Sequence, residues 1–321
     1  MSLKHQLRRL LFATRLDRVI DLSRRNVPRE IKLCHSRTIH RGPDAHTLIG
    51  DMLRSGKPAA FGKLGDVEVK ALSWHLGIPR YYAVNRAVPS YGEQELFEQA
   101  GVFPKNEATY HRFCDVFAER LPDLDLCALW HNPGEFEITE LLCPRAHWTD
   151  LTALEPYFNP AAPWSAALAG KRVLVVHPFE DTIRVQYPKR GHIWSSVPGL
   201  LPDFELLTLK SPYGFSANSF SDWFAMLGWL EERVTALARD PGFDIALIGC
   251  GAAGIPLAVH CKRLGKIGIH TGGPTQLFFG IRGGRWDTRA EFQRFFNDAW
   301  VRPRPEETPQ EAKKVDKGGY W

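Results

Sequence analysis

Short apolar runs alternate with longer amphipathic segments through the second half of the chain. The run within residues 171–179, "KRVLVVHPF", is almost continuously apolar, as in a strand that is covered on both faces. Residues 220–240 instead place apolar side chains at helical spacing, which predicts a long amphipathic helix starting near Ser221 or Asp222. The same patterns predict strands at 204–212, 244–249 and 266–273, and helices at 181–190 and 253–265.

The first half follows a similar alternation. Residues 57–77, "KPAAFGKLGDVEVKALSWHLG", predict a strand, a tight turn and a helix closed by Gly77. A helix from Asp44 to Leu53, helical structure within 92–120 and a strand at 126–131 are also expected, whereas 134–143 is ambiguous. Strands that alternate with helices favour a Rossmann-like α/β fold with a mostly parallel sheet flanked by helices.

Breaks in the pattern divide the chain into three parts. A basic helical arm is expected over 1–43, ending where Gly42 and Pro43 interrupt it. A single α/β domain is expected over 44–305, with a sub-boundary near 156–168 marked by prolines. Residues 306–321 are polar and predict a tail that wraps the surface or is mobile.

The net charge of +5 is concentrated at the start of the chain. Residues 1–41 carry eleven Lys or Arg against three acids, so the remainder is slightly acidic. Such an arm could lie on an anionic membrane surface, or pack on the protein with its basic face in water. We expect no nucleic-acid binding, because the remainder of the chain is acidic and shows no recognised module.

Other features favour a soluble or membrane-peripheral protein of the cytoplasm. The early apolar run "LLFA" is too short for a signal-peptide core. No run approaches the roughly 18 apolar residues of a membrane span. The six cysteines are scattered without a C-x-x-C pair, which favours reduced thiols and a cytoplasmic location. If the arm does lie on a membrane, its inner face is the one expected.

A G-x-G-x-x-G pattern follows the predicted strand at 244–249. Its glycines are Gly249, Gly251 and Gly254, and such a turn can bring backbone N–H groups to a diphosphate. A nicotinamide site also needs an acid about 20 residues further on, but no carboxylate occurs between Gly254 and Asp287. Two interpretations stay open: a tight strand–helix crossing, or a phosphate or sugar contact that includes Ala252 and Gly272.

An acidic turn, "GDVE", follows the predicted strand near residue 60. Asp66 and Glu68 come immediately after Gly65, at the start of the next helix. They could serve only to favour the positive end of the helix dipole. They could also form a D-x-E site for Mn²⁺ or Mg²⁺, because hard cations prefer carboxylate oxygens.

The two segments together resemble the GT-D-fold glycosyltransferases. The likeness rests on the front motif "GDVE" and on "IALIGCGAAGIPLA" followed by "GKIGIHTGG". It implies metal-assisted transfer from a nucleoside-diphosphate sugar, commonly UDP-linked, to a glycan, glycolipid or glycoprotein acceptor. Asp66 and Glu68 would then take the metal and the diphosphate. Lys63 stands where the family often has Arg, and Val67 replaces a glycine.

The segment after the strand at 171–179 offers further candidates. Glu180 or Asp181 could be the general base for an acceptor hydroxyl, and Arg184 could contact a phosphate. The same residues could equally cap a helix and form a solvated basic turn. A metal-dependent glycosyltransferase is the leading hypothesis, and a dinucleotide-binding oxidoreductase and a non-catalytic sugar-nucleotide-binding or scaffold protein are the alternatives.

Overall fold

The computed structural model describes residues 37–78, 93–213, 219–310, 312–315 and 318–321. Within them, eight strands form a single sheet in the order β1-β4-β3-β2-β8-β7-β5-β6, and every paired strand is parallel to its neighbour. The predicted α/β fold with a parallel sheet is therefore confirmed. The strands are β1 (Ile39–His40), β2 (Ala59–Gly62), β3 (Leu126–Leu129), β4 (His147–Asp150), β5 (Arg172–His177), β6 (Glu205–Lys210), β7 (Ile245–Ile248) and β8 (Ile267–His270).

Helices cover both faces of the sheet. One face carries α4 (Asp66–Leu76), α7 (Glu107–Arg120), α8 (Glu135–Leu142), α11 (Trp223–Arg239) and α12 (Gly254–Arg263). The other carries α3 (Gly42–Arg54), α9 (Glu180–Gln186), α13 (Thr275–Phe278) and the 3-10 helices η3 (Leu151–Leu154), η4 (Pro156–Phe158) and η5 (Trp164–Leu168). Shorter elements are α6 (Glu93–Glu98), α10 (Arg190–Ile193), α14 (Gly284–Asp287), α15 (Ala290–Gln293) and η9 (Pro305–Glu307).

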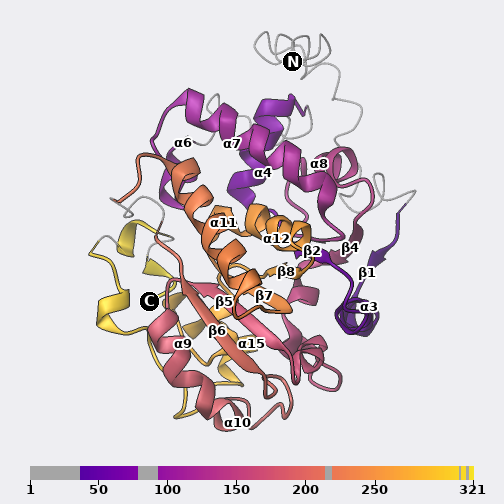
Figure 1. The fold of residues 1–321 in the computed structure, drawn as a ribbon, viewed down its shortest axis with the longest axis vertical. Coiled ribbons are helices and arrows are strands. Elements are labelled where there is room, and N and C mark those ends of the chain that lie inside the picture. The colour runs from indigo at the N-terminus through magenta and orange to yellow at the C-terminus, as the bar shows by residue number, and fades with distance from the viewer. Residues whose placement is uncertain (1–36, 79–92, 214–218, 311, 316–317) are drawn as a thin grey trace.

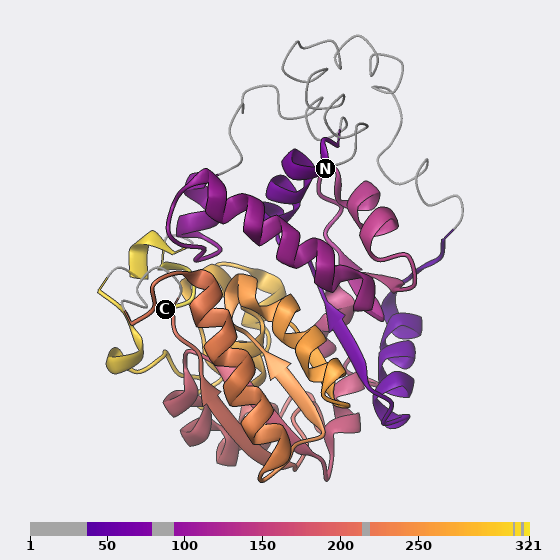
Figure 2. The ribbon, with the colours of Figure 1, turned by 45° about the horizontal axis from the view of Figure 1, so that its top comes forward.

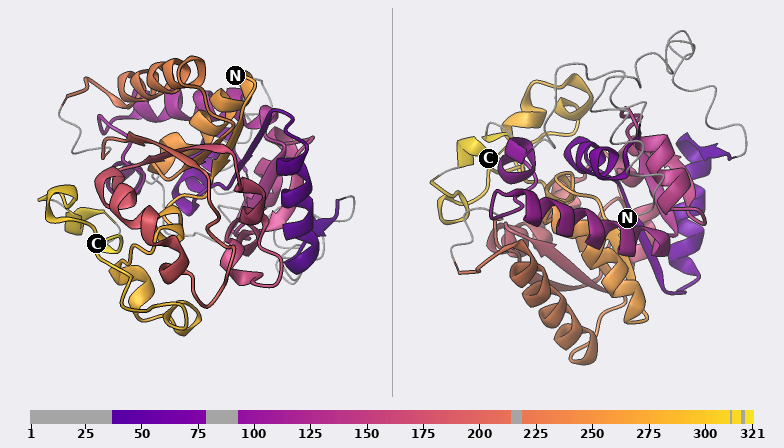
Figure 3. Two further views of the ribbon diagram at one scale, coloured as in Figure 1. Left: turned by 60° about the horizontal axis from the view of Figure 1, so that its bottom comes forward. Right: turned by 90° about the horizontal axis from the view of Figure 1, so that it is seen from above.

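The figures show how these layers lie. Helices α11 and α12 run side by side in front of β5, β7 and β8 (Figures 1 and 2). Seen from above, α7 crosses the same side of the molecule, next to α12 (Figure 3). In all of these views α3 and the C-terminal residues lie on opposite sides of the molecule.

Alternating side chains of the strands feed two apolar cores. In β5, Leu174 and Val176 face the α11–α12 side, whereas Val173 and Val175 face the side of α3 and α9. All four are buried, so both faces of the strand are covered, as its continuous apolar run predicted.

Local signals fix several helix ends as the sequence predicted. Asp222 precedes α11, and its carboxylate accepts a hydrogen bond of 2.7 Å from the Ala225 N–H. Gly77 ends α4 in the left-handed conformation, with φ of 64°. The helical structure expected within 92–120 is two helices, because Gly101 (φ 71°) and Pro104 interrupt it between α6 and α7.

The structure also corrects parts of the sequence prediction. Helix α3 begins at Gly42 and keeps Pro43 in its first turn, where a missing N–H costs nothing. Strands β1 and β4 were not predicted, and β1 shows that the sheet begins before residue 44. The ambiguous segment 134–143 contains α8. Of the prolines near 156–168, Pro156 starts η4 and Pro163 precedes η5, within the connection between β4 and β5 of the same sheet.

Two remaining predictions concern the membrane. The arm over 1–36 lies outside the described residues. Among the helices that the structure does describe, none has both the length and the apolar character needed to cross a bilayer.

Candidate functional site

The carboxyl ends of all eight described strands lie at one edge of the sheet. Strand β8 pairs with β2 on one side and β7 on the other, so the "GDVE" turn after β2 and the glycine turn after β7 flank the end of β8. After β2 and β7 the chain passes to α4 and α12 on one face, whereas after β8 it passes to α13 on the other. Such a reversal opens a crevice in which α/β proteins bind ligands.

A pocket of about 760 Å³, its mouth included, occupies the part of this edge above β5, β6, β7 and β8. Its polar lining includes His177, Gln276 and the glycines at 249, 251 and 273. Its aromatic walls are Phe179, Tyr213, Trp223, Tyr320 and Trp321. A concave site with aromatic walls and a few polar groups suits a planar ligand.

The three glycines of the G-x-G-x-x-G pattern meet different surroundings. Gly249 and Gly251 line the pocket, whereas Gly254 does not. A Cβ on Gly254 would lie 1.8 Å from His270 Nδ1, and one on Gly249 would lie 2.5 Å from His177 Cδ2. Gly251 has a φ of 60°, and a Cβ there would meet only the Ala100 carbonyl oxygen, at 3.5 Å. Tight packing therefore accounts for Gly249 and Gly254, while Gly251 shapes the backbone at the pocket.

Ala252 and Gly272, the remaining candidates of these turns, lie outside the lining. Ala252 is buried in the core that contains α12. Gly272 has a φ of 69°, and a Cβ there would lie 3.2 Å from Lys63 Nζ. The turn after β8 therefore brings its backbone close to the end of β2.

The "GDVE" turn places its two carboxylates differently. Asp66 points along α4 and forms an ion pair of 2.7 Å with Lys70. Glu68 folds back over the N-terminus of the helix, so that its Oε2 would lie 2.2 Å from a Cβ on Gly65. Burial raises the pKa of Glu68, and the N–H groups of Glu68 and Gly65 and the charge of Lys63 oppose that rise. A side chain at position 65 would therefore displace the Glu68 carboxylate from its place over the start of α4.

Within the described residues, the "GDVE" turn offers two carboxylates and no preformed metal site. No group of three or more His, Cys, Asp or Glu in the described ranges is arranged to hold an ion. Mg²⁺ is often held by one or two carboxylates together with phosphates and water. The Asp66–Lys70 pair is partly exposed, so opening it would cost at most about 1 kcal/mol.

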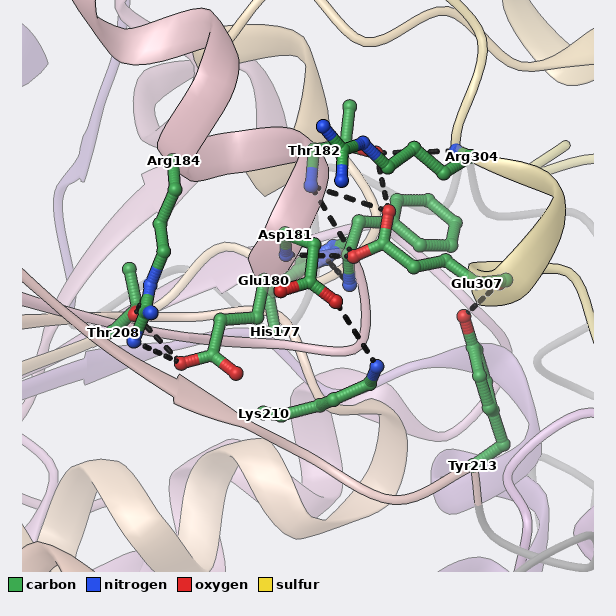
Figure 4. A network of polar contacts seen from close by, with 11 residues as sticks. His177, Glu180, Asp181, Thr182, Arg184, Thr208, Lys210, Tyr213, Arg304 and Glu307 are labelled. Atoms are coloured by element: carbon green, nitrogen blue, oxygen red, sulfur yellow. Dashed lines mark hydrogen bonds and ion pairs between the residues drawn. The ribbon is translucent and has the colours of Figure 1, made fainter.

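Glu180, Asp181 and Arg184 come shortly after the lining residue Phe179 but are not in the lining themselves. Figure 4 shows their polar contacts. Glu180 accepts hydrogen bonds from Arg184 Nη2 at 2.8 Å and from Thr208 Oγ1 at 2.6 Å. Asp181 lies 3.4 Å from Lys210 Nζ and keeps 46% of its side chain exposed. The backbone N–H of Asp181 donates to Glu307, a residue of the tail.

His177, at the end of β5, lines the pocket. Its Nδ1 accepts a hydrogen bond of 3.0 Å from the Phe179 N–H. Burial lowers its pKa to about 3, so the ring is neutral and carries its proton on Nε2. Nε2 is bonded to Cδ2, the atom that faces Gly249, so an N–H donor lies on the ring edge nearest the glycine turn. The neighbouring Cys250 is a neutral thiol, because burial raises its pKa to about 12.

His177 makes the protein less stable in acid. The pKa of His177 in the folded protein lies below the unfolded value of about 6.5. The contribution of the neutral ring to the unfolding free energy is therefore complete above pH 6.5 and is lost as the pH falls. Replacing it by Asn, whose Oδ1 can accept the Phe179 N–H, removes this titration. From pH 6.5 to 5, wild type should lose about 1.6 kcal/mol more of unfolding free energy than His177→Asn. Urea denaturation at both pH values measures this difference. The exposed His192 provides the control, and a His177→Asn variant as acid-sensitive as His192→Asn would contradict the prediction.

The tail supplies pocket residues that sequence reasoning missed. The Trp321 indole N–H donates to the Glu307 carbonyl oxygen at 3.0 Å, and Gln276 Nε2 donates to the Tyr320 carbonyl oxygen at 3.1 Å. A Cβ on Gly273 would lie 2.4 Å from the Tyr320 ring. The predicted polar tail therefore wraps back and forms a pocket wall. The adjacent aromatic pair in an otherwise polar segment was the available signal.

Comparison with known proteins adds a likeness of fold. No protein-family model matches the sequence, and no curated protein is similar to it. Two solved structures of the domain of unknown function 1792, one in selenomethionine-substituted form and one described as having a distinct glycosyltransferase fold, share 12% and 11% identity with this chain. Each comparison covers 87% of this chain and 94% of the other, with a TM-score of 0.46. Likeness at this level carries no activity or residue role over to this chain.

Proposed function

We propose that the protein is a glycosyltransferase that takes its sugar from a nucleoside-diphosphate donor, with UDP-sugars as the first candidates. The observation that carries this proposal is the position of two distant motifs. The acidic turn after β2 and the glycine turn after β7 flank the same strand, β8, at the edge with the pocket. Strands are spaced about 4.8 Å apart, so the two turns lie roughly 10 Å from each other, a span that one donor molecule can bridge.

Each part of the site suits a part of such a donor. The aromatic walls would hold the flat nucleoside portion, and Gly251 and Gly273 would let the backbone approach its diphosphate. Asp66 and Glu68 would hold Mn²⁺ or Mg²⁺, which when bound would neutralise charge on the diphosphate. Asp181, the more exposed of the two candidate bases, would accept the proton of an acceptor hydroxyl on a glycan or glycoconjugate.

The dinucleotide-binding alternative fits the same edge less well. A dinucleotide site would need its acid at the end of β8, and that strand is followed by Thr271, Gly272 and Gly273 after His270. A non-catalytic sugar-nucleotide-binding protein would share the pocket and differ only in turnover.

Membrane contact through residues 1–41 is a separate proposal, tested by liposome pelleting before and after deletion of that segment.

Calorimetric titration tests the donor. We expect UDP-sugars to bind wild type with Mn²⁺, and NAD(H) not to bind. Transfer to a panel of glycan acceptors should fall about 100-fold in Glu68→Gln, because a charge is lost where the diphosphate departs. Binding of NAD(H) without any nucleotide sugar would overturn the proposal, and binding without transfer to any acceptor would favour the non-catalytic alternative.

A further inference from the structure

Lys63 brings a positive charge to the point where β2 and β8 end. A Cβ on Gly272 would lie 3.2 Å from its Nζ, and Gly272 precedes Gly273 of the pocket lining. On its other side, Nζ lies 4.5 Å from the centroid of the Trp130 ring. The ammonium group thus lies between Gly272 and the Trp130 ring, and the residue as a whole is half-buried.

The carboxylates around Lys63 do not form close pairs with it. Glu68, Glu155 and Glu135 all act on it electrostatically, but within the described residues no carboxylate oxygen is within 4.0 Å of Nζ, and no hydrogen bond of its ammonium is found. Lys70, one turn into α4, differs because it has its own partner in Asp66 at 2.7 Å. The N–H groups of Lys63 are therefore left for a ligand.

Each of these carboxylates has donors of its own. Glu135 accepts hydrogen bonds from the Trp130 N–H at 3.1 Å and from the Asn132 N–H at 2.8 Å. Glu155 accepts one from the Tyr157 hydroxyl. Backbone N–H groups at the start of α4 serve Glu68. None of the three depends on Lys63 for its hydrogen bonding.

An ammonium group in a partly buried position costs free energy when it has lost hydration and has no hydrogen-bond acceptor in exchange. Burial lowers the pKa of Lys63 to about 8, which still leaves it mainly charged at pH 7. A second cation is close by, since Arg285 Nη1 donates to the Tyr320 hydroxyl at 3.2 Å at the pocket wall. Two cationic side chains therefore lie next to the lining residues Gly273 and Tyr320, outside the lining itself.

We infer that Lys63 binds the diphosphate of the donor as a built-in cation, so that diphosphate binding does not depend wholly on a metal. This inference rests on the proposed function. During transfer, the bond between the anomeric carbon and the diphosphate oxygen breaks, and its electron pair leaves with the diphosphate. The acceptor oxygen bonds to that carbon and gives its proton to a base. Charge-assisted hydrogen bonds from Lys63 would stabilise the departing oxygens.

Titration of UDP in EDTA, and again with Mn²⁺, tests this role. We expect wild type to bind UDP in EDTA and to bind it more tightly with Mn²⁺. In EDTA, Lys63→Met should bind at least about tenfold more weakly, and Lys63→Arg should recover part of the loss. Lys70→Met is the matched control and should stay within about twofold of wild type. Melting temperatures establish that each variant is folded.

The outcomes separate the two proposals. Binding of UDP by Lys63→Met equal to that by wild type in EDTA overturns the role of Lys63 alone, as does wild-type binding that requires Mn²⁺ absolutely. Absence of UDP binding by wild type in both buffers overturns the proposed UDP-linked function, and the role of Lys63 with it. If Lys63→Met does not fold, UDP binding by Lys63→Arg and by wild type is compared in EDTA. Weaker binding by Lys63→Arg supports the role of Lys63 and equal binding overturns it, because a guanidinium group does not reproduce the hydrogen-bond geometry of an ammonium group.

Discussion

Gly254→Ala is expected to lower the unfolding free energy by about 2–3 kcal/mol, because it overpacks the contact between α12 and β8. The new Cβ would lie 1.8 Å from His270 Nδ1 and 2.2 Å from its Cε1, and His270 is itself buried. Backbone strain cannot be the cause, since Gly254 has a φ of −64° and a ψ of −46°. At such angles alanine is otherwise the better helix former by about 1 kcal/mol.

A second substitution identifies the clash as the cause. In a His270→Ala background the imidazole is absent, so Gly254→Ala should cost less than about 0.5 kcal/mol. Urea denaturation of wild type, both single variants and the double variant gives the coupling free energy. Gly251→Ala is the control. Because Gly251 has a φ of 60°, this substitution should lower the unfolding free energy by about 1–2 kcal/mol in either background. An undiminished cost of Gly254→Ala without the imidazole would contradict this explanation.

The G-x-G-x-x-G motif at 249–254 shows what the sequence alone could establish about the site. Strand, glycine turn and helix are local features, and the apolar run and the spacing predicted all three. What fills the space beside Gly254 is a side chain of the next strand, His270, and glycine spacing carries no information about it. For the same reason, spacing could not show that Gly249 is packed against His177.

Prediction of the fold was limited in the same way: elements with a strong local pattern could be predicted, and elements that depend on distant segments could not. The long apolar runs of β5 and β7 predicted strands, and the amphipathic pattern predicted α11. Strand β1 has two residues and β4 reads "HWTD", so neither carries a strong local pattern. They form because each pairs with a neighbour: Trp148 of β4 pairs with both Ile39 and Cys127. Tertiary context therefore determined these strands.

The tail is the clearest case of a long-range determinant. Its composition predicted a polar segment on the surface, yet Glu307 is 1% exposed. Its carboxylate accepts hydrogen bonds from the N–H groups of Asp181, at 2.7 Å, and Thr182, at 3.3 Å, and from the Thr182 hydroxyl (Figure 4). Helix α9 has no side-chain cap from its own N-cap residue, Phe179, so the tail provides the capping carboxylate.

Glu307→Ala is expected to cost about 3 kcal/mol of unfolding free energy, because it leaves buried donors at the start of α9 without an acceptor. The effect should reach the pocket, since the Trp321 indole and the Tyr213 hydroxyl both donate to the Glu307 carbonyl oxygen. Loosening this segment would move Trp321 from the pocket wall. We therefore expect donor affinity to fall at least tenfold, which corresponds to about 1.4 kcal/mol of lost contact.

The neighbouring Glu306 allows a matched comparison, because it is exposed and equal in charge. Glu306→Ala should change the unfolding free energy by less than about 0.5 kcal/mol and leave donor binding unaltered. Glu307→Gln, which keeps one acceptor oxygen, should fall between the two. Thermal unfolding gives the stabilities, and the rate of proteolysis within the tail reports its release from α9. Equal stability and equal proteolysis of Glu306→Ala and Glu307→Ala would show that the capping contact does not hold the pocket wall in place. A stability loss with unchanged donor affinity would instead separate the cap from the ligand site, and place the donor away from Trp321.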